Sequence, residues 1–168
     1  MITSTNNLIF TVLQTALKAG KAIMEIYAEP FDVEFKSDNS PLTIADKKAH
    51  SIIVVALAGT GLPILSEEGS QISYDTRKSW NDFWLVDPLD GTKEFIKKNG
   101  DFTVNIALIS NQQPAMGVVY APVPAYLYWG SENGSFRLDV SKSDNKIYEH
   151  PDKIFQFAER LPCISRPD

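Results

Sequence analysis

Apolar positions recur every three to four residues in two stretches near the N-terminus, which is the period of an amphipathic helix. The first stretch covers residues 6–28 and ends before Pro30, which cannot continue a helix. The second opens at Thr43 and ends at Gly59-Thr-Gly61. Asp46 stands three residues after Thr43, which is the spacing of a capping box. The pattern predicts two helices, with Asp46 as a capping residue of the second.

Beyond these helices the chain consists mainly of short alternating or continuous apolar runs, which predict strands. Asn133-Gly134 separates the last two runs and is the strongest hairpin signal in the chain. Consecutive hairpins build an antiparallel sheet, so the predicted fold class is α+β, with two N-terminal helices layered on a largely antiparallel sheet. The predicted strands are residues 31–36, 63–66, 83–86, 102–109, 115–121, 126–129 and 135–140; residues 37–41, 69–80 and 141–153 are predicted loops or connectors.

Composition narrows the functional classes. The 168 residues suffice for one domain with a real core, and the apolar and charged shares of 43% and 22% are those of an ordinary globular protein. The net charge of −5 gives no basic surface for nucleic acid or for an anionic membrane. An acidic protein that binds phosphates would need cations to offset the repulsion between them.

The few cysteines and histidines exclude some metal chemistry. Cys163 is the single cysteine, which rules out an intramolecular disulfide and a cysteine-built metal site. His50 and His150 lack the spacing of zinc ligands, and we interpret both as ordinary residues. The N-terminus has neither a basic region nor an unbroken apolar segment, so no signal peptide or membrane span is predicted, and the cytoplasm is the expected location.

Two acidic residues follow the predicted strand at 83–86. Asp87 comes directly after it and Asp90 lies three residues further on. Pro88 fixes its own φ angle and is expected to turn the chain, so that both carboxylates face the same space beyond the strand end. The alternative is an ordinary hairpin, because Asp-Gly between apolar segments is also a strong turn signal.

The next residues add a place for an anion. Gly91 allows close backbone approach, and Thr92 can begin a short helix whose free N–H groups point at an anion. Carboxylates that hold hard cations, beside N–H groups that hold phosphate, are the parts that a metal-assisted phosphatase requires.

A second short strand also ends in acids. Residues 63–66 lead into Glu67 and Glu68. If this strand and the one at 83–86 are neighbours in one sheet, Glu67, Asp87 and Asp90 come together. The alternative is that Glu67 and Glu68 are two solvated carboxylates at a strand end.

Three ordered segments resemble the N-terminal motifs of the lithium-sensitive inositol monophosphatase superfamily. They are Asp38-x-Ser-Pro-x-Thr-x-x-Asp46, Leu65-Ser-Glu-Glu68 and Trp84-x-Val-Asp-Pro-Leu-Asp-Gly-Thr92. Gly-Thr-Lys-Glu-Phe95 and the run Asn99-Gly-Asp-Phe-Thr-Val-Asn-Ile-Ala-Leu108 resemble more narrowly its bacterial 3′(2′),5′-bisphosphate nucleotidase branch. Inositol monophosphatases usually have Asn where Glu94 stands.

The resemblance implies a role for each matching residue. Glu67, Asp87 and the carbonyl of Leu89 match ligands of a first Mg²⁺, while Asp87 and Asp90 match ligands of a second, so Asp87 would bridge two ions. The family uses two or three Mg²⁺ ions. Hard oxygen donors suit this metal.

The remaining implied roles concern the attacking water and the substrate. Asp46 and Thr92 match the pair that orients and deprotonates the water. Lys36 and Lys93 are lesser candidates for anion contacts, with solvated lysines as the alternative. The residues implied to contact substrate are Glu67, Leu89, Asp90, Gly91 and Thr92.

The activity implied by the resemblance is hydrolysis of the 3′-phosphate of adenosine 3′,5′-bisphosphate to AMP and phosphate, in support of sulfate assimilation. The partner would be this small nucleotide; peripheral association with the inner membrane and a homo-oligomer stay open. One alternative is an inositol or sugar phosphate phosphatase with the same metals. Another is a metal- or phosphate-binding module without catalysis.

The resemblance also predicts a domain division. Residues 1–150 would form the metal- and phosphate-binding α+β domain, and residues 151–168 would begin a C-terminal α/β domain that is missing here. That domain carries a Trp-Asp motif in the family, and this sequence has no Trp-Asp pair. The chain is therefore expected to be the N-terminal part of a longer protein, with weak or no activity by itself.

Overall fold

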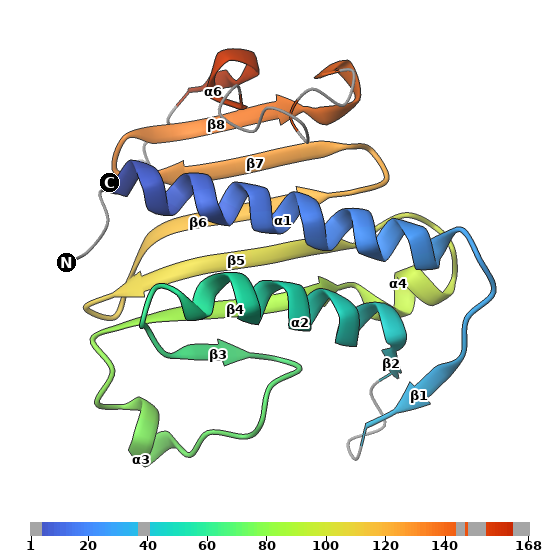
Figure 1. Ribbon diagram of the computed structural model, residues 1–168, viewed down its shortest axis with the longest axis horizontal. Helices are drawn as coiled ribbons and strands as arrows, with labels where there is room; N and C mark the ends of the chain where they lie inside the picture. The colour runs from blue at the N-terminus through green and yellow to red at the C-terminus, as the bar shows by residue number, and fades with distance from the viewer. Residues whose placement is uncertain (1–4, 37–40, 144–146, 148–153, 163–168) are drawn as a thin grey trace, which may run out of the picture.

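Two helices cover one face of a sheet in the computed structural model, which describes residues 5–36, 41–143, 147 and 154–162. Helix α1, Thr5–Tyr27, and helix α2, Ile44–Ala58, lie side by side on that face (Figure 1). Both predicted helices are confirmed. The predicted capping box of α2 is present. The Thr43 side chain accepts a hydrogen bond from the backbone N–H of Asp46, and the Asp46 side chain accepts one from the backbone N–H of Thr43.

The described part of the sheet has seven strands in the order β3-β4-β5-β6-β7-β8-β9. Only the pair β3–β4 is parallel, and each other neighbouring pair in this sheet is antiparallel. The predicted α+β architecture with a largely antiparallel sheet is confirmed. The strands are β3 Ile64–Ser66, β4 Asp82–Asp90, β5 Thr103–Ser110, β6 Gln113–Ala121, β7 Tyr126–Ser131, β8 Gly134–Asp139 and β9 Glu159–Leu161.

The predicted strand at 31–36 is shorter and lies outside this sheet. It becomes β1, Val33–Phe35, which pairs only with β2, Pro41–Thr43, among the described residues. Residue 41 was predicted to end a loop, whereas it begins β2; residues 37–40 of that loop lie outside the described part. Short helical turns occupy other connections: α3 Tyr74–Arg77, α4 Thr92–Ile96, η1 Val140–Ser143 and α6 Ile154–Phe157.

Strand β4 does not end where the sequence pattern predicts. It continues through Pro88 to Asp90, with a break in the pairing register between Asp87 and Asp90. Pro88 has no N–H to give to a neighbouring strand. The N–H of Leu89 instead donates to Asp87 Oδ1 at 3.2 Å. Strands β4 and β5 are antiparallel neighbours, but α4 lies between them in the sequence, so Asp90-Gly91 is not the tight turn of the hairpin alternative.

The predicted hairpin near Asn133-Gly134 is confirmed with a shift of one residue. Ser131 pairs with Gly134, so the two turn residues are Glu132 and Asn133. Gly134 has a φ of +118°, a conformation that glycine adopts without strain. Trp129, from the same hairpin, is buried and stacks on Phe136 with ring centroids 5.4 Å apart.

The hydrophobic core lies between the helices and the sheet. Every second residue of a strand faces it, so Trp84 and Val86 of β4 are buried while Leu85 is 45% exposed on the other face. Val119 is 42% exposed on that same free face. The free face of the sheet is therefore partly apolar and accessible.

The described residues after the predicted domain boundary join the same sheet and core as the residues before it. Strand β9 pairs with β8, and Ile154 of α6 is fully buried in the core. The boundary at 150/151 and the residues His150 and Cys163 lie outside the described part, so the division stays a prediction. No helix in the described ranges is long and apolar enough to span a bilayer.

Candidate functional site

The parallel pairing of β3 and β4 brings Glu67 next to Asp87. Ser66 pairs with Val86, and the N–H of Glu67 donates to the carbonyl of Val86 at 3.1 Å. The next residue on each strand is therefore an acid at the same end of the sheet. The two segments are neighbours as the sequence pattern predicts, and their register aligns the acids.

The environment of Asp87 is strongly acidic. Burial, the negative charges of Glu67 and Asp90 and a hydrogen bond with Glu67 together raise the pKa of Asp87 to about 7, with burial as the largest cause. The hydrogen bond from the Leu89 N–H partly opposes it. A carboxyl group in this position gains from a nearby cation, because the cation would offset both neighbouring charges.

Asp90 is held by a residue that the sequence reasoning missed. Asn105 Nδ2 donates to Asp90 Oδ2 at 3.0 Å, and Thr103 Oγ1 donates to Asn105 Oδ1 at the same distance. Asn105 lies opposite Asp87 in the β4–β5 pairing. Strand alternation could have indicated Asn105, since it is the one polar residue in the apolar run from 104 to 109.

Asp46 serves the helix cap and the site together. Its Oδ2 accepts hydrogen bonds from the backbone N–H and the hydroxyl of Thr43, at 2.7 and 2.6 Å. Its Oδ1 faces Thr92, whose hydroxyl lies 3.1 Å away. Asp46 is 1% exposed. The carboxylate is thus fixed by the cap while one oxygen reaches the strand end that carries the other acids.

Gly91 occupies a position that only glycine fits. Its φ is +93°, and a Cβ at this residue would lie 2.6 Å from the carbonyl oxygen of Asp101. Helix α4 begins directly afterwards at Thr92, as the sequence predicts. Gly91 therefore lets the chain turn tightly between Asp90 and the start of α4.

Lys36 lies against the second acid pair. Its Nζ is 2.6 Å from Glu68 Oε1 and 3.2 Å from Glu67 Oε1. Burial raises the pKa of Glu68, and the contact with Lys36 opposes part of that rise. The alternative in which Lys36 is a solvated lysine and Glu68 a solvated carboxylate is therefore not what the structure shows. Lys93, in contrast, is exposed. Asp38 and Ser40 of the first motif lie outside the described residues.

The donor atoms fit a hard cation in type. Glu67, Asp87, Asp90 and the carbonyl of Leu89 offer only oxygens, which Mg²⁺ prefers. Within the described ranges, no three acidic, histidine or cysteine side chains already form a group that could hold a metal ion. The acids repel one another, and Glu67 and Asp90 bond to Lys36 and Asn105. A bound metal would compete with Lys36 for Glu67 and with Asn105 for Asp90.

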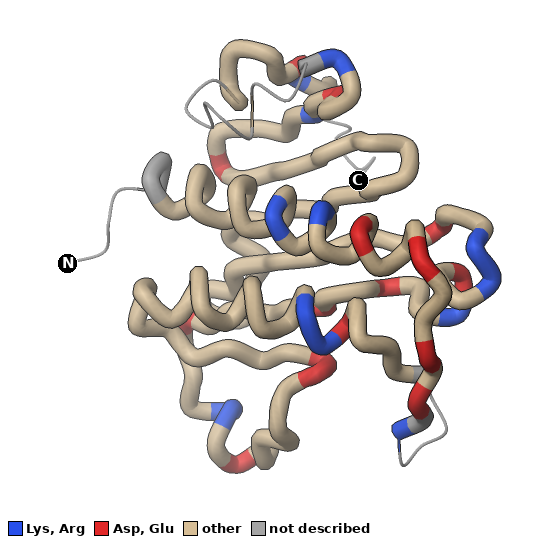
Figure 2. Tube along the Cα trace, turned by 45° about the vertical axis from the view of Figure 1, so that its right-hand side comes forward, with Lys and Arg blue, Asp and Glu red and all other residues tan. Residues whose placement is uncertain are grey.

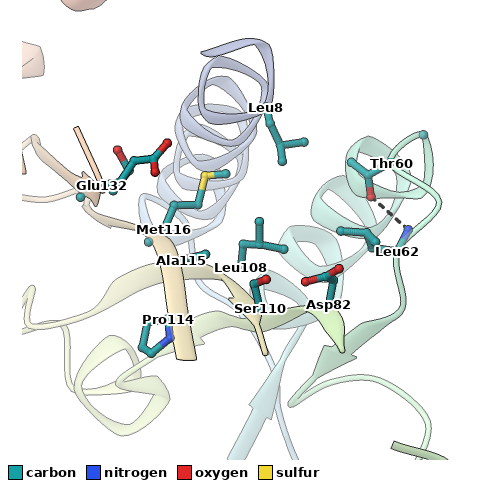
Figure 3. Close-up of a pocket in the computed structure, with 14 residues that line it drawn as sticks. Leu8, Thr60, Leu62, Asp82, Leu108, Ser110, Pro114, Ala115, Met116 and Glu132 are labelled. Carbon is teal, nitrogen blue, oxygen red and sulfur yellow. Dashed lines mark hydrogen bonds between the residues drawn. The ribbon is translucent and has the colours of Figure 1, made fainter. Parts of the chain in front are cut away.

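A hollow in the described structure lies away from the candidate site. It has a volume of about 880 Å³ and opens between the start of α1, the end of α2 and one end of strands β4 to β7 (Figure 3). Asp82, at the first position of β4, lines it, whereas Asp87 lies roughly 17 Å further along the strand at about 3.4 Å per residue. None of the predicted site residues lines this hollow.

Comparisons with known proteins agree with the fold and the motifs. The sequence model described as "Inositol monophosphatase family" matches residues 5–152. The chain is 51% identical over 130 residues to the 3′(2′),5′-bisphosphate nucleotidase CysQ of Escherichia coli O157:H7, covering 75% of this chain and 52% of that protein. It is 44% identical over 159 residues to the CysQ of Buchnera aphidicola from Acyrthosiphon pisum, covering 92% and 58%.

A solved structure matches the fold over the full length of this chain. The crystal structure of CysQ from Bacteroides thetaiotaomicron, described as a bacterial member of the inositol monophosphatase family, superposes with a TM-score of 0.74 at 40% identity. The superposition covers 100% of this chain and 62% of that one. The chain thus spans about half to three fifths of the length of these relatives.

The fold and the site define an α+β protein with a cluster of oxygen donors where two strands end. With the family match over residues 5–152, the chain belongs to the inositol monophosphatase family.

Proposed function

We propose that this chain is the metal- and phosphate-binding part of a Mg²⁺-dependent phosphomonoesterase. Its substrate would be adenosine 3′,5′-bisphosphate, which with water gives AMP and inorganic phosphate. The observation that carries the proposal is the alignment of Glu67 beside Asp87 by the β3–β4 pairing, with Asp90 close enough to raise the pKa of Asp87. The names of relatives at 44–51% identity support the choice of substrate.

The proposed metal ligands are those that the resemblance to the family implies, and all of them are oxygen donors at this strand end. Glu67, Asp87 and the carbonyl of Leu89 would hold a first Mg²⁺, and Asp87 and Asp90 would hold a second, with a third ion as in the family. Bound Mg²⁺ supplies positive charge for phosphate oxygens and makes a coordinated water more acidic. Asn105 keeps the Asp90 carboxylate in place through its amide.

The hydrogen bonds of Asp46 support its role toward the attacking water. Thr92 would orient the water through its hydroxyl, and Asp46 Oδ1 would accept the proton that the water loses. The cap bonds from Thr43 hold the carboxylate rigid during this transfer. The N–H groups of Gly91 and Thr92, together with Glu67, Leu89 and Asp90, would contact the substrate phosphate.

The cellular setting is part of the same proposal. Removal of adenosine 3′,5′-bisphosphate in the cytoplasm would support sulfate assimilation. Basic and acidic positions are interspersed along the chain trace (Figure 2), which accords with a small anionic substrate bound at one local site and not with a broad nucleic-acid surface.

Two alternatives stand beside this function. The description of the matching family favours an inositol or sugar phosphate as the substrate. A metal- or phosphate-binding module without turnover is the second alternative, and the contact between Lys36 and Glu67 favours its phosphate-binding form, because this lysine pairs with one predicted ligand of the first metal.

Release of phosphate from three substrates distinguishes the alternatives. The 168-residue chain is incubated with Mg²⁺ and with adenosine 3′,5′-bisphosphate, inositol 1-phosphate or a sugar phosphate, and kcat/KM is compared. We expect adenosine 3′,5′-bisphosphate to be preferred by at least about tenfold, which is about 1.4 kcal/mol of transition-state binding. Asp87→Asn should abolish the release, and Asp82→Asn, at the other end of β4, should not.

Each other result selects an alternative. Equal or reversed preference assigns the site to inositol or sugar phosphates. No release from any substrate, with Mg²⁺ binding retained, assigns this polypeptide by itself to the non-catalytic class, and loss of Mg²⁺ binding as well overturns the proposal.

A further inference from the structure

Glu67 and Glu68 are the two central residues of a tight turn at the end of β3. The N–H of Gly69 donates to the carbonyl of Ser66 at 3.1 Å and closes this turn. Such a bond between the first and the fourth residue is that of a β-turn. The direction in which the Glu67 side chain points therefore depends on how Ser66 and Gly69 are held.

Helix α2 holds the first residue of this turn through His50. The helix packs near β3 and β4 (Figure 1), and His50 Nδ1 lies 2.9 Å from Ser66 Oγ, a hydrogen bond in which either atom can donate. Both residues are half-buried, so the bond is partly shielded from water, which strengthens it. The ring also lies beside the fourth residue of the turn, since a Cβ on Gly69 would be 3.8 Å from His50 Cε1.

His50 stands one turn of α2 after Asp46. Side chains four residues apart lie on the same face of an α-helix, so these two leave α2 toward the same side. Asp46 Oδ1 accepts from the Thr92 hydroxyl, while His50 reaches Ser66. One helix therefore sets the position of the carboxylate proposed to take the proton and the position of the turn that carries Glu67.

The other supports of the turn do not replace this contact. The N–H of Glu67 donates to the carbonyl of Val86, which fixes the backbone of Glu67 against β4. Lys36 bonds to both acids of the turn, but a metal bound at Glu67 would compete with this lysine. The bond between His50 and Ser66 uses no atom of Glu67, so a cation at the carboxylate would leave it in place.

We propose that His50 is a positioning residue for the metal ligand Glu67 and that it acts through the hydroxyl of Ser66. The inference rests on the proposed function, because it assigns Glu67 to the first Mg²⁺. His50 would act without touching substrate or metal, by holding the turn so that the Glu67 carboxylate lies beside Asp87. Loss of an outer group that supports a metal site typically weakens metal binding by about 10- to 100-fold. This role adds to the interpretation of His50 as an ordinary residue, which rested on its lack of zinc-ligand spacing.

Variants at the two ends of the bond separate hydrogen bonding from packing. His50→Leu keeps an apolar side chain but cannot bond to Ser66, and Ser66→Ala removes only the hydroxyl. His50→Asn places a side-chain amide close to where Nδ1 stands and can keep the bond. Isothermal titration calorimetry measures the Mg²⁺ affinity of each 168-residue variant. We expect about a tenfold loss in His50→Leu and in Ser66→Ala, no further loss when the two are combined, and recovery in His50→Asn.

Thr60→Val is the matched control. Trp84 Nε1 donates to Thr60 Oγ1 at 3.0 Å, so this bond also joins the helix layer to the sheet, but it lies past the other end of α2. Trp84 is fully buried, and its N–H loses its partner in the variant. Urea unfolding should therefore show at least as large a loss of stability for Thr60→Val as for His50→Leu, whereas the Mg²⁺ affinity of Thr60→Val should equal that of wild type.

Amide hydrogen exchange in chelator adds a readout that does not depend on metal. The N–H groups of Glu67 and Gly69 donate to Val86 and Ser66, which protects them from exchange. His50→Leu should speed exchange at both by about fivefold, the factor that corresponds to one ordinary hydrogen bond. Thr60→Val should leave both rates unchanged.

The outcomes separate this inference from the proposed function. A wild-type chain that binds no Mg²⁺ overturns the proposed function, and the positioning of a metal ligand falls with it. If the wild type binds Mg²⁺ and both His50→Leu and Ser66→Ala bind it equally well, only the role of His50 is overturned. The same follows if Thr60→Val weakens Mg²⁺ binding as much as His50→Leu does, or if exchange at Glu67 and Gly69 is unaffected by His50→Leu. Should His50→Leu fail to fold, Ser66→Ala decides by the same criteria.

Discussion

The hydroxyl of Thr92 donates to Asp46 Oδ1 at 3.1 Å, across 46 positions of sequence. The other oxygen of Asp46 bonds to the backbone and side chain of Thr43 and completes the cap of α2. One buried carboxylate therefore connects the first turn of a scaffold helix to the start of α4. The stability of α2 and the geometry of the candidate site share this group.

Substitution of the two threonines should separate these functions. Thr43→Ala removes the cap and should lower the unfolding free energy by about 1 kcal/mol. Thr92→Val leaves the capping box in place and should cost less stability, while it reduces any phosphate release by roughly 10²-fold or more. Urea unfolding and phosphate release are measured on both variants. If both variants lost the same stability and the same activity, the assignment of Thr43 to the helix cap and of Thr92 to the candidate site would be contradicted.

Gly91→Ala should destabilise the chain far more than Gly59→Ala. The first Cβ would lie 2.6 Å from the carbonyl oxygen of Asp101 in a residue with φ of +93°, whereas the second would meet no atom within 4 Å. We expect a loss of about 2 kcal/mol or more for Gly91→Ala and a change near zero for Gly59→Ala. Thermal and urea unfolding measure both, and similar effects would show that the turn at Gly91 relaxes.

Stability without metal should fall as the pH rises. The folded chain raises the pKa of Asp87 from 3.8 to about 7, so between these values the folded state binds a proton that the unfolded state has released. The unfolding free energy then decreases with pH across this window. Urea unfolding in chelator from about pH 4 to about pH 8 should show this decrease, and Asp87→Asn should flatten it. A wild-type profile that rises through the window would refute the prediction.

Mg²⁺ binding should depend more on Asp87 than on any other acid of β4, because Asp87 is the proposed bridge between two ions. Asp87→Asn should weaken Mg²⁺ binding by at least about tenfold, the lower limit for loss of groups that support a metal site. Asp82→Asn is the matched control, since this acid lies at the opposite end of the same strand. Isothermal titration calorimetry compares them, and an unchanged affinity in Asp87→Asn would exclude the bridging role.

Lys36→Met should cost more stability than Lys47→Met. Lys36 pairs with Glu68, whose side chain is only 9% exposed, so removal of the lysine leaves a largely buried charge without its partner. Such a loss costs about 3 kcal/mol when both groups are fully buried and less here, because Lys36 is partly exposed. Lys47 pairs with Glu34 at the surface, and that pair should contribute well under about 1 kcal/mol. Urea unfolding of both variants checks the difference.

Local patterns in the sequence determined the layers of this protein. The three-to-four spacing of α1 and α2 and the alternation along β5 and β6 each arise from the geometry of a single element, so a reader of the sequence can recognise them without knowing the partners. The Thr43–Asp46 capping box and the acids at the ends of β3 and β4 are equally local. These signals suffice for the α+β class and for most residues of the candidate site.

Tertiary structure decided which of these residues meet. The parallel register that aligns Glu67 with Asp87, the contact of Lys36 with Glu68, and the bond from Asn105 to Asp90 join residues from separate segments. The continuation of β4 past Pro88 also depends on pairing with β5. Strand register and long-range contacts are set by the packing of the whole chain, because many registers satisfy the same local alternation and only one of them buries the shared core.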